Sequence, residues 1–338
     1  MRESFAIDAE LGEALQANEE QIAEQIAAAV SEQVERDYRA GQCPALRDAH
    51  PRAHGCVEAE FRVNEDVRPN LAQGVFVPGK SYRAWIRFSN GSPKRKEPDV
   101  RGMAIKLLDV PGDKILPEER EARTQDFVLM SSPRFFMDDA ARYLRLSRAV
   151  ASGNRLRAFL ALGPRGFLIA KKASPKINSP LETQYWSAVP YRLGDGARRQ
   201  AVKYSAVPQP VPVRTVMPSD RGPNFLRETM VKQLAAGEAR FDFLVQPRTP
   251  GMSVENTMTE WDKKDAQFFK VATITIPRQQ FDTAERNDFG ENLSFTPWHA
   301  VPAHRPLGGV NRIRRVVYQS VSKKRHDLNG APRREPGA

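Results

Sequence analysis

Apolar residues first recur with a helical period over residues 8–38, a segment rich in Ala, Glu and Gln. The positions that share this spacing are Ile22, Ile26, Ala29, Val30 and Val34. Gly41 follows, and glycine readily ends a helix. The pattern predicts one long helix that packs on the main body or on a second subunit, so a homodimer remains open.

From about residue 55 the period changes from helical to two. Alternating apolar and polar side chains between turn residues predict strands at 57–63, 82–88, 102–108, 126–130, 200–205, 239–246 and 269–276. Helices are predicted at 138–172 and 222–236, and a last helix follows the Pro-rich connection 295–302. Short strands with tight turns predict an α+β fold, in which flanking helices surround an antiparallel β-sheet or β-barrel.

The composition is that of an ordinary globular protein, and it narrows the classes of partner. The 338 residues are 40% hydrophobic and 28% charged, and no run approaches the ~20 apolar residues of a membrane span. The N-terminus lacks the apolar core of a secretory signal, so we expect a cytoplasmic protein. The net charge of +11 comes without a nucleic-acid motif, so no nucleic acid is expected as a partner. Cys43 and Cys56 make neither a disulfide framework nor a zinc site.

Two segments of the predicted sheet carry residues that could do chemistry. His54 stands at the entrance of the first strand, where an imidazole serves as an acid–base group or as a polar residue satisfied by the backbone. Arg87 and Ser89 alternate onto the same face of the second strand. They either bind an anion and orient a histidine, or form the exposed polar face of a barrel strand.

The last helix carries Arg314 and Tyr318, which stand four residues apart and so share one face. A guanidinium beside a phenol favours the phenolate, as any opposite charge favours the ionised form of an acid. One role of an anionic tyrosine is to bind ferric haem iron. The alternative is a surface helix on which the two residues are merely neighbours.

Taken in order, these segments resemble the haem-containing catalases, and most closely the small catalase-related peroxidases. The matching motifs are His54-Gly55, Arg87-Phe88-Ser89, Asp99-x-Arg101-Gly102-x-Ala104-x-Lys106, Pro133-x-Phe135-Phe136, Phe295-x-Pro297 and Arg314-x-x-x-Tyr318. The resemblance implies a catalase-type barrel and divides the chain into a helical segment 1–41, a haem-binding domain 42–326 and a flexible tail 327–338.

The resemblance also implies haem b as the cofactor, with a role for each residue that faces its iron. Tyr318 is then the axial ligand of the iron, and Arg314 keeps its phenol ionised. His54 is the distal histidine that moves a proton from one peroxide oxygen to the other. Ser89 hydrogen-bonds this histidine and fixes its ring.

The same resemblance assigns the residues around the edge of the haem. Arg87 and Arg325 match arginines that pair with the haem propionates. Phe136, in preference to Phe135, lies over the haem.

The distal side departs from the pattern of full catalases at two positions. Full catalases carry an arginine three residues before the distal histidine, and counting from His54 puts Pro51 there, with Arg52 as a substitute one position later. Ser131 occupies the place of their distal asparagine, so its hydroxyl is expected to help position peroxide. Both departures argue against fast dismutation of hydrogen peroxide, but not against haem.

Three functions remain open at this point. The first is a haem peroxidase that cleaves hydrogen peroxide or an organic hydroperoxide and oxidises a second organic or lipid substrate. The second is a haem enzyme that rearranges fatty-acid hydroperoxides, as an allene oxide synthase or a lyase does. The third is a non-catalytic haem-binding protein.

Overall fold

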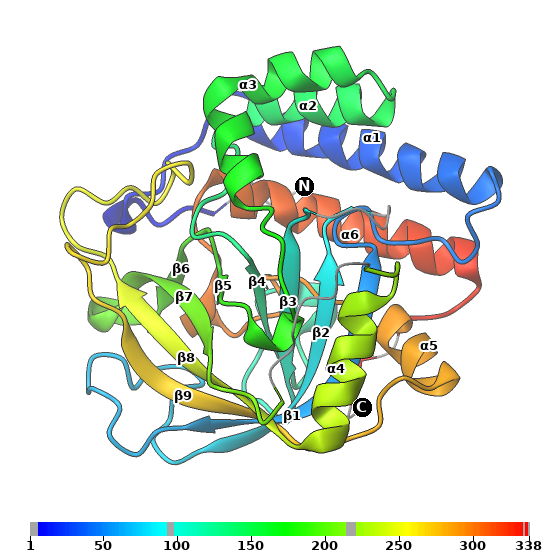
Figure 1. The fold of residues 1–338 in the computed structure, drawn as a ribbon. Coiled ribbons are helices and arrows are strands. Elements are labelled where there is room, and N and C mark those ends of the chain that lie inside the picture. The colour runs from blue at the N-terminus through cyan, green and yellow to red at the C-terminus, as the bar shows by residue number, and fades with distance from the viewer. Residues whose placement is uncertain (1–5, 93–97, 214–220, 334, 337–338) are drawn as a thin grey trace.

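The computed structural model describes residues 6–92, 98–213, 221–333 and 335–336 of the chain. Within these ranges the strands form one antiparallel sheet in the order β5-β4-β3-β2-β1-β9-β8-β7-β6 (Figure 1). An additional pairing of β5 with β7 closes this sheet into a barrel of eight strands, with β6 beside it. The strands are β1 (Arg52–Val63), β2 (Ser81–Asn90), β3 (Arg101–Leu107), β4 (Gln125–Met130), β5 (Tyr185–Trp186), β6 (Tyr191–Leu193), β7 (Gln200–Pro208), β8 (Ala239–Pro247) and β9 (Phe269–Ile276). The predicted antiparallel barrel is confirmed.

Buried and exposed side chains alternate along the second half of β1, and this pattern explains why the strand packs around a core. Val57, Ala59, Phe61 and Val63 are buried, while the residues between them are exposed. Because side chains alternate along a strand, a slip of one residue would turn this apolar set toward solvent. Phe61 packs edge-on against Phe243 at 5.0 Å between ring centroids, so aromatic side chains fill the barrel.

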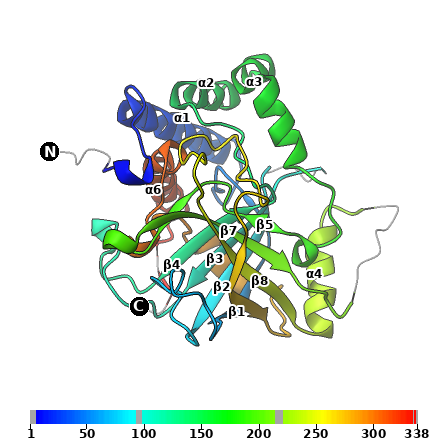
Figure 2. The ribbon, with the colours of Figure 1, turned by 90° about the vertical axis from the view of Figure 1, so that its left-hand side faces the viewer.

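Six α-helices lie outside the barrel in the part of the chain that the structure describes. They are α1 (Glu19–Arg39), α2 (Ala140–Ala151), α3 (Arg155–Lys172), α4 (Phe225–Ala236), α5 (Ala284–Asn292) and α6 (Gly309–Asn329). In both ribbon views α1, α2 and α3 form a layer at one end of the molecule, with α6 between that layer and the barrel (Figures 1 and 2). Ile26 and Val30 of α1 share a buried cluster with Leu144 of α2 and with Val317 of α6.

The two ends of the chain differ from the prediction. The first long helix begins at Glu19 instead of residue 8, because Asp8 caps a short 3-10 turn that ends at the left-handed Gly12 (φ 84°). The flexible tail expected from residue 327 is also wrong for the residues described. Helix α6 runs on to Asn329, and beyond it Glu335 pairs with the buried Lys106 at 2.8 Å. No helix in the described ranges is long and apolar enough to cross a bilayer.

Candidate active site

Helix α6 brings Arg314 and Tyr318 together as their spacing predicts. The Nη2 of Arg314 donates a hydrogen bond to the Tyr318 phenol oxygen at 2.8 Å, and its guanidinium carbon lies 4.9 Å from the centre of the Tyr318 ring. Burial opposes the positive charge, but the neighbouring phenols of Tyr318 and Tyr191 outweigh it and raise the pKa of Arg314. The phenol oxygen of Tyr318 therefore has a permanently charged donor beside it.

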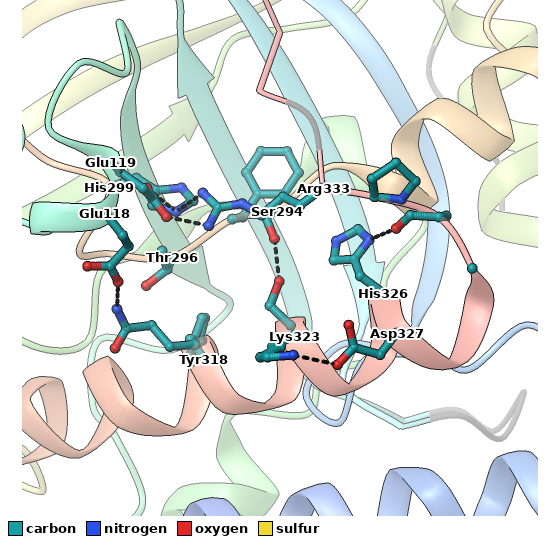
Figure 3. A pocket seen from close by; sticks show the side chains of 16 residues that line it. Glu118, Glu119, Ser294, Thr296, His299, Tyr318, Lys323, His326, Asp327 and Arg333 are labelled. Carbon is teal, nitrogen blue, oxygen red and sulfur yellow. Dashed lines mark hydrogen bonds and ion pairs between the residues drawn. The ribbon is translucent and has the colours of Figure 1, made fainter.

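Tyr318 lines a cavity of about 770 Å³ between α6 and the segment that precedes it (Figure 3). Thr296 and His299 lie across the cavity from α6, and Arg333 closes one side of it. A smaller cavity of about 70 Å³ shares Tyr318 with the first and reaches Arg325. Sites for cofactors typically measure about 300–1,000 Å³, so the space beside this tyrosine is large enough to hold one.

Three arginines converge on a single carboxylate next to the smaller cavity. Arg47, Arg87 and Arg325 approach the carboxylate of Glu291 at 2.7, 3.6 and 3.1 Å. Burial and the charge of Arg47 lower the pKa of both Arg87 and Arg325 to about 9. The Nε of Arg87 is buried without an acceptor among the described residues. One carboxylate cannot balance three guanidiniums, so this arginine cluster has charge and donors left for an anionic ligand.

The histidine beside Ser89 is His50, which the sequence-based interpretation passed over. The Ser89 hydroxyl oxygen lies 3.3 Å from Nδ1 of His50, and Nη1 of Arg87 donates to the His50 backbone carbonyl at 2.9 Å. A side chain at Gly102 would stand 2.5 Å from the His50 ring, so only glycine leaves room for this contact. Burial and the charges of Arg87 and Arg314 lower the pKa of His50 to about 4, so its imidazole is neutral at pH 7.

His54 has a different environment, and the expected contact between Ser89 and His54 is wrong. A register shift between Ala53 and Gly55 lets β1 bulge at His54. Its Nε2 lies 2.6 Å from Oδ1 of Asn90, and the residue lines a separate cavity of about 580 Å³. Burial, together with the charges of nearby arginines, lowers the pKa of His54 to about 3.

The spacing of Arg47 and His50 is the signal that could have corrected this choice. Arg47 stands three residues before His50, which is the arginine-to-histidine spacing of full catalases. Counting from His54 instead placed Pro51 at that position and made the arginine look absent. Arg52, the expected substitute, is directed away from the arginine cluster and donates to the Pro223 carbonyl and to Asn224.

The two remaining predicted residues, Ser131 and Phe136, lie in the segment between β4 and α2. Ser131 donates its one hydroxyl proton to the Ala173 carbonyl at 2.9 Å and accepts from the Arg101 backbone at 2.8 Å. Its one proton is therefore engaged by the protein, and it can meet a peroxide only as an acceptor. Phe136 stacks on Phe135 with ring centroids 4.4 Å apart and meets Tyr143 of α2 edge-on.

Comparison with solved structures shows which fold carries this site. A fungal catalase matches 87% of the chain with a TM-score of 0.63 at 15% sequence identity, and the match covers 61% of that catalase. Catalase A from Saccharomyces cerevisiae gives a TM-score of 0.63 at 14% identity, covering 87% of this chain and 65% of the yeast protein. A bacterial catalase gives a TM-score of 0.59 at 15% identity, covering 89% and 62%. At these identities the fold is shared, and the chain spans under two thirds of each catalase.

Comparison of sequences shows the family. No family model matches the chain. It is 30% identical over 279 residues to a catalase-related peroxidase of Mycolicibacterium paratuberculosis (strain ATCC BAA-968 / K-10), in a match that covers 79% of this chain and 85% of that protein. With the catalase barrel and the paired arginine and tyrosine of α6 already established, the chain belongs to the catalase-related peroxidases, a family of oxidoreductases.

Proposed function

We propose that this protein binds haem b and reduces hydrogen peroxide or an organic hydroperoxide while it oxidises a second organic or lipid substrate. The observation that carries the proposal is the arrangement around Tyr318. Its phenol, hydrogen-bonded by Arg314, lines a cavity that leads to the arginine cluster of Arg47, Arg87 and Arg325. A tetrapyrrole with two carboxylates needs both an axial ligand and a cationic rim.

The arginine cluster fits the propionates of such a group. Among the described residues, the buried Arg87 and Arg325 and the half-buried Arg47 have Glu291 as their one shared carboxylate, and the Nε of Arg87 has no acceptor. Two further carboxylates would turn the excess positive charge into charge-assisted hydrogen bonds. Arg47 replaces Arg52 in this assignment, because Arg52 contacts the 223–224 segment.

Tyr318 is the residue that would bind the haem iron, because it lines the cavity beside α6. When bound through a phenolate, haem supplies the iron at which the oxygen–oxygen bond of a peroxide is broken. Arg314 contributes a positive charge and an N–H donor to the phenol oxygen of Tyr318. Phe136 remains our candidate for the ring that lies over the cofactor.

The proton transfer is assigned to His50 in place of His54. Ser89 engages Nδ1 of His50, which leaves Nε2 as the ring nitrogen that can meet a substrate. A neutral imidazole accepts a proton from one peroxide oxygen at Nε2 and returns it to the other, so that water leaves as the bond breaks. Ser89 and Arg87 are positioning residues here, since one holds the ring and the other holds the backbone carbonyl of His50.

Product analysis with the haem-loaded protein tests this function. We expect consumption of hydrogen peroxide or cumene hydroperoxide to require a phenolic reductant and to yield water or the matching alcohol. An epoxide or aldehyde formed from a lipid hydroperoxide without any reductant would instead show the rearranging enzyme. Haem-loaded protein that leaves all three peroxides unchanged would show a non-catalytic haem-binding protein.

A further inference from the structure

Helix α3 turns its large apolar side chains toward solvent. Leu156 and Leu160 are 69% and 68% exposed, and Phe159, Phe167 and Leu168 are between 43% and 56% exposed. The positions of α3 that are buried hold Ala161, Gly166 and Ile169. A helix on the surface of a globular protein normally buries its large apolar residues and exposes polar ones. This helix instead leaves five large apolar residues exposed, which indicates that something apolar covers its outer face.

The exposed residues form one patch in spite of a kink. Gly163 adopts a non-helical conformation (φ 65°, ψ 170°) and Pro164 follows it, so α3 consists of two halves. Phe159 in the first half and Phe167 in the second meet edge-on, with ring centroids 5.4 Å apart. The two halves therefore present a joined surface, which we call the α3 patch, made of Leu156, Phe159, Leu160, Phe167 and Leu168.

The chain segment that carries the α3 patch is rich in basic residues and contains no acidic ones. Residues 140–181 contain nine Lys and Arg and no Asp or Glu. Arg155 and Arg157 lie at the start of α3, and Lys171 and Lys172 at its end, all exposed. None of these four has an acidic partner within the described part of the chain. A helix with Phe and Leu on its outer face and only basic residues around them is typical of proteins that lie on an anionic membrane surface.

The position of α3 leaves this face accessible. In two views at right angles, the first half of α3 lies at the outer edge of the helical layer, and the second half runs from there toward the barrel (Figures 1 and 2). A second copy of the chain is a poor occupant, because a two-fold contact would place the same basic segment against itself. An anionic bilayer offers both a hydrocarbon boundary for the apolar residues and phosphates for the basic ones.

We propose that the α3 patch and its flanking basic residues bind the surface of an anionic lipid bilayer. Leu156, Phe159 and Leu160 enter the boundary between headgroups and acyl chains with Phe167 and Leu168. Arg155, Arg157, Lys171 and Lys172 contact the lipid phosphates. The attachment involves no residue of the candidate active site, so it is measured without turnover and does not depend on haem.

Vesicle flotation of the purified full chain tests the proposal. The probes are vesicles of phosphatidylcholine alone and of phosphatidylcholine mixed with phosphatidylglycerol. We expect the protein to float with the mixed vesicles at low salt and to be released as the salt concentration rises. The variant Phe159→Ser with Leu160→Ser should lower the partition coefficient by at least about tenfold. Its control is Val77→Ser, since Val77 is an exposed apolar residue outside α3 (51% exposed).

Variants that replace two lysines by glutamate test the electrostatic part of the proposal in the same flotation assay. Lys171→Glu with Lys172→Glu should lower binding to the mixed vesicles by roughly thirtyfold or more. Lys263→Glu with Lys264→Glu, at two exposed lysines outside α3, should change it little. Absence of wild-type binding to the mixed vesicles, or equal binding by the α3 variants, overturns the proposal. So does a wild-type dimer in solution that Phe159→Ser with Leu160→Ser converts to a monomer, because the patch would then join two copies of the chain.

Discussion

Replacing Arg325 by methionine should stabilise the haem-free protein, although Arg325 is buried and hydrogen-bonded. Its guanidinium shares the Glu291 carboxylate with Arg47 and Arg87, so the arginine cluster holds three positive charges on one negative charge. The cluster suits an anionic ligand and is electrostatically unfavourable without one. Removing one positive charge should therefore lower the repulsion within the cluster and raise the free energy of unfolding of the haem-free protein.

The magnitude follows from the pKa and the contacts of Arg325. Burial and the charge of Arg47 lower its pKa from 12.5 to about 9, which corresponds to about 5 kcal/mol against the charged form. At pH 7 the side chain is charged in both the folded and the unfolded protein, so this whole cost is present. Arg325→Met also loses hydrogen bonds to the Glu291 backbone oxygen (2.7 Å) and Oε1 (3.1 Å), worth about 3 kcal/mol together. The free energy of unfolding should rise by about 2 kcal/mol.

Glu291→Gln should move stability in the opposite direction. It leaves three guanidiniums close together without a carboxylate, and an uncompensated buried charge typically costs about 3–5 kcal/mol. The surface variant Lys323→Met is the control on the same helix. Lys323 is 79% exposed and forms an ion pair with the exposed Asp327, so its loss should change the free energy of unfolding by less than about 0.5 kcal/mol.

Urea unfolding of the haem-free proteins, followed by tryptophan fluorescence at pH 7, measures all three variants. Adding haem should then stabilise the wild type more than Arg325→Met, because the variant lacks one propionate donor. The reasoning is refuted if Arg325→Met lowers the free energy of unfolding by more than about 2 kcal/mol. That result would mean that the arginine cluster is a balanced structural network with no need of a further anion.

Three further outcomes follow from the site and the tail. His50→Ala should slow the reaction with peroxide at least about a hundredfold, while His54→Ala stays within about threefold in stopped-flow measurements; the reverse order would return the proton transfer to His54. The wild-type rate should be level from pH 5 to 8 and fall near pH 4, where His50 becomes protonated; a fall centred near pH 6.5 would point to an unperturbed histidine. Glu335→Gln should cost about 1–3 kcal/mol in urea unfolding at pH 7, because Lys106 loses one of two carboxylates at 2.8 Å. Lys106 and His299 outweigh burial and lower the pKa of Glu335 from 4.5 to about 2, so its contribution is fully present above about pH 4.5 and is lost as the pH falls toward 2; equal stabilities of wild type and variant at pH 7 would exclude it.

The barrel was predictable where buried and exposed positions alternate along a strand, as they do from Val57 to Val63 in the second half of β1. The elements that the sequence did not reveal are short or lack a pattern. Strand β5 has two residues, Tyr185–Trp186, yet its pairing with β7 closes the barrel. Two residues cannot display a period. Helix α5 escaped prediction because Ala284–Asn292 contains almost no apolar residues and buries only Gly290.

The candidate site was predictable on α6 and not on β1, for a physical reason. On α6 a spacing of four residues fixes the contact between Arg314 and Tyr318, because helical geometry is regular. On β1 the bulge at His54 breaks the alternation that assigns side chains to faces. The residue that meets Ser89 is instead His50, which precedes the strand in a left-handed conformation (φ 57°) that no periodic pattern signals.

The absorption spectrum of Tyr318→Phe, purified after expression with added haem, tests the central claim most directly. The matched control is Tyr143→Phe, which removes another buried phenol close to Arg314 and Tyr318. We expect the wild type and the control to show the Soret band of a high-spin ferric haem, and Tyr318→Phe to retain little haem. Full haem loading of Tyr318→Phe, or a wild-type protein without any haem band, would contradict the account.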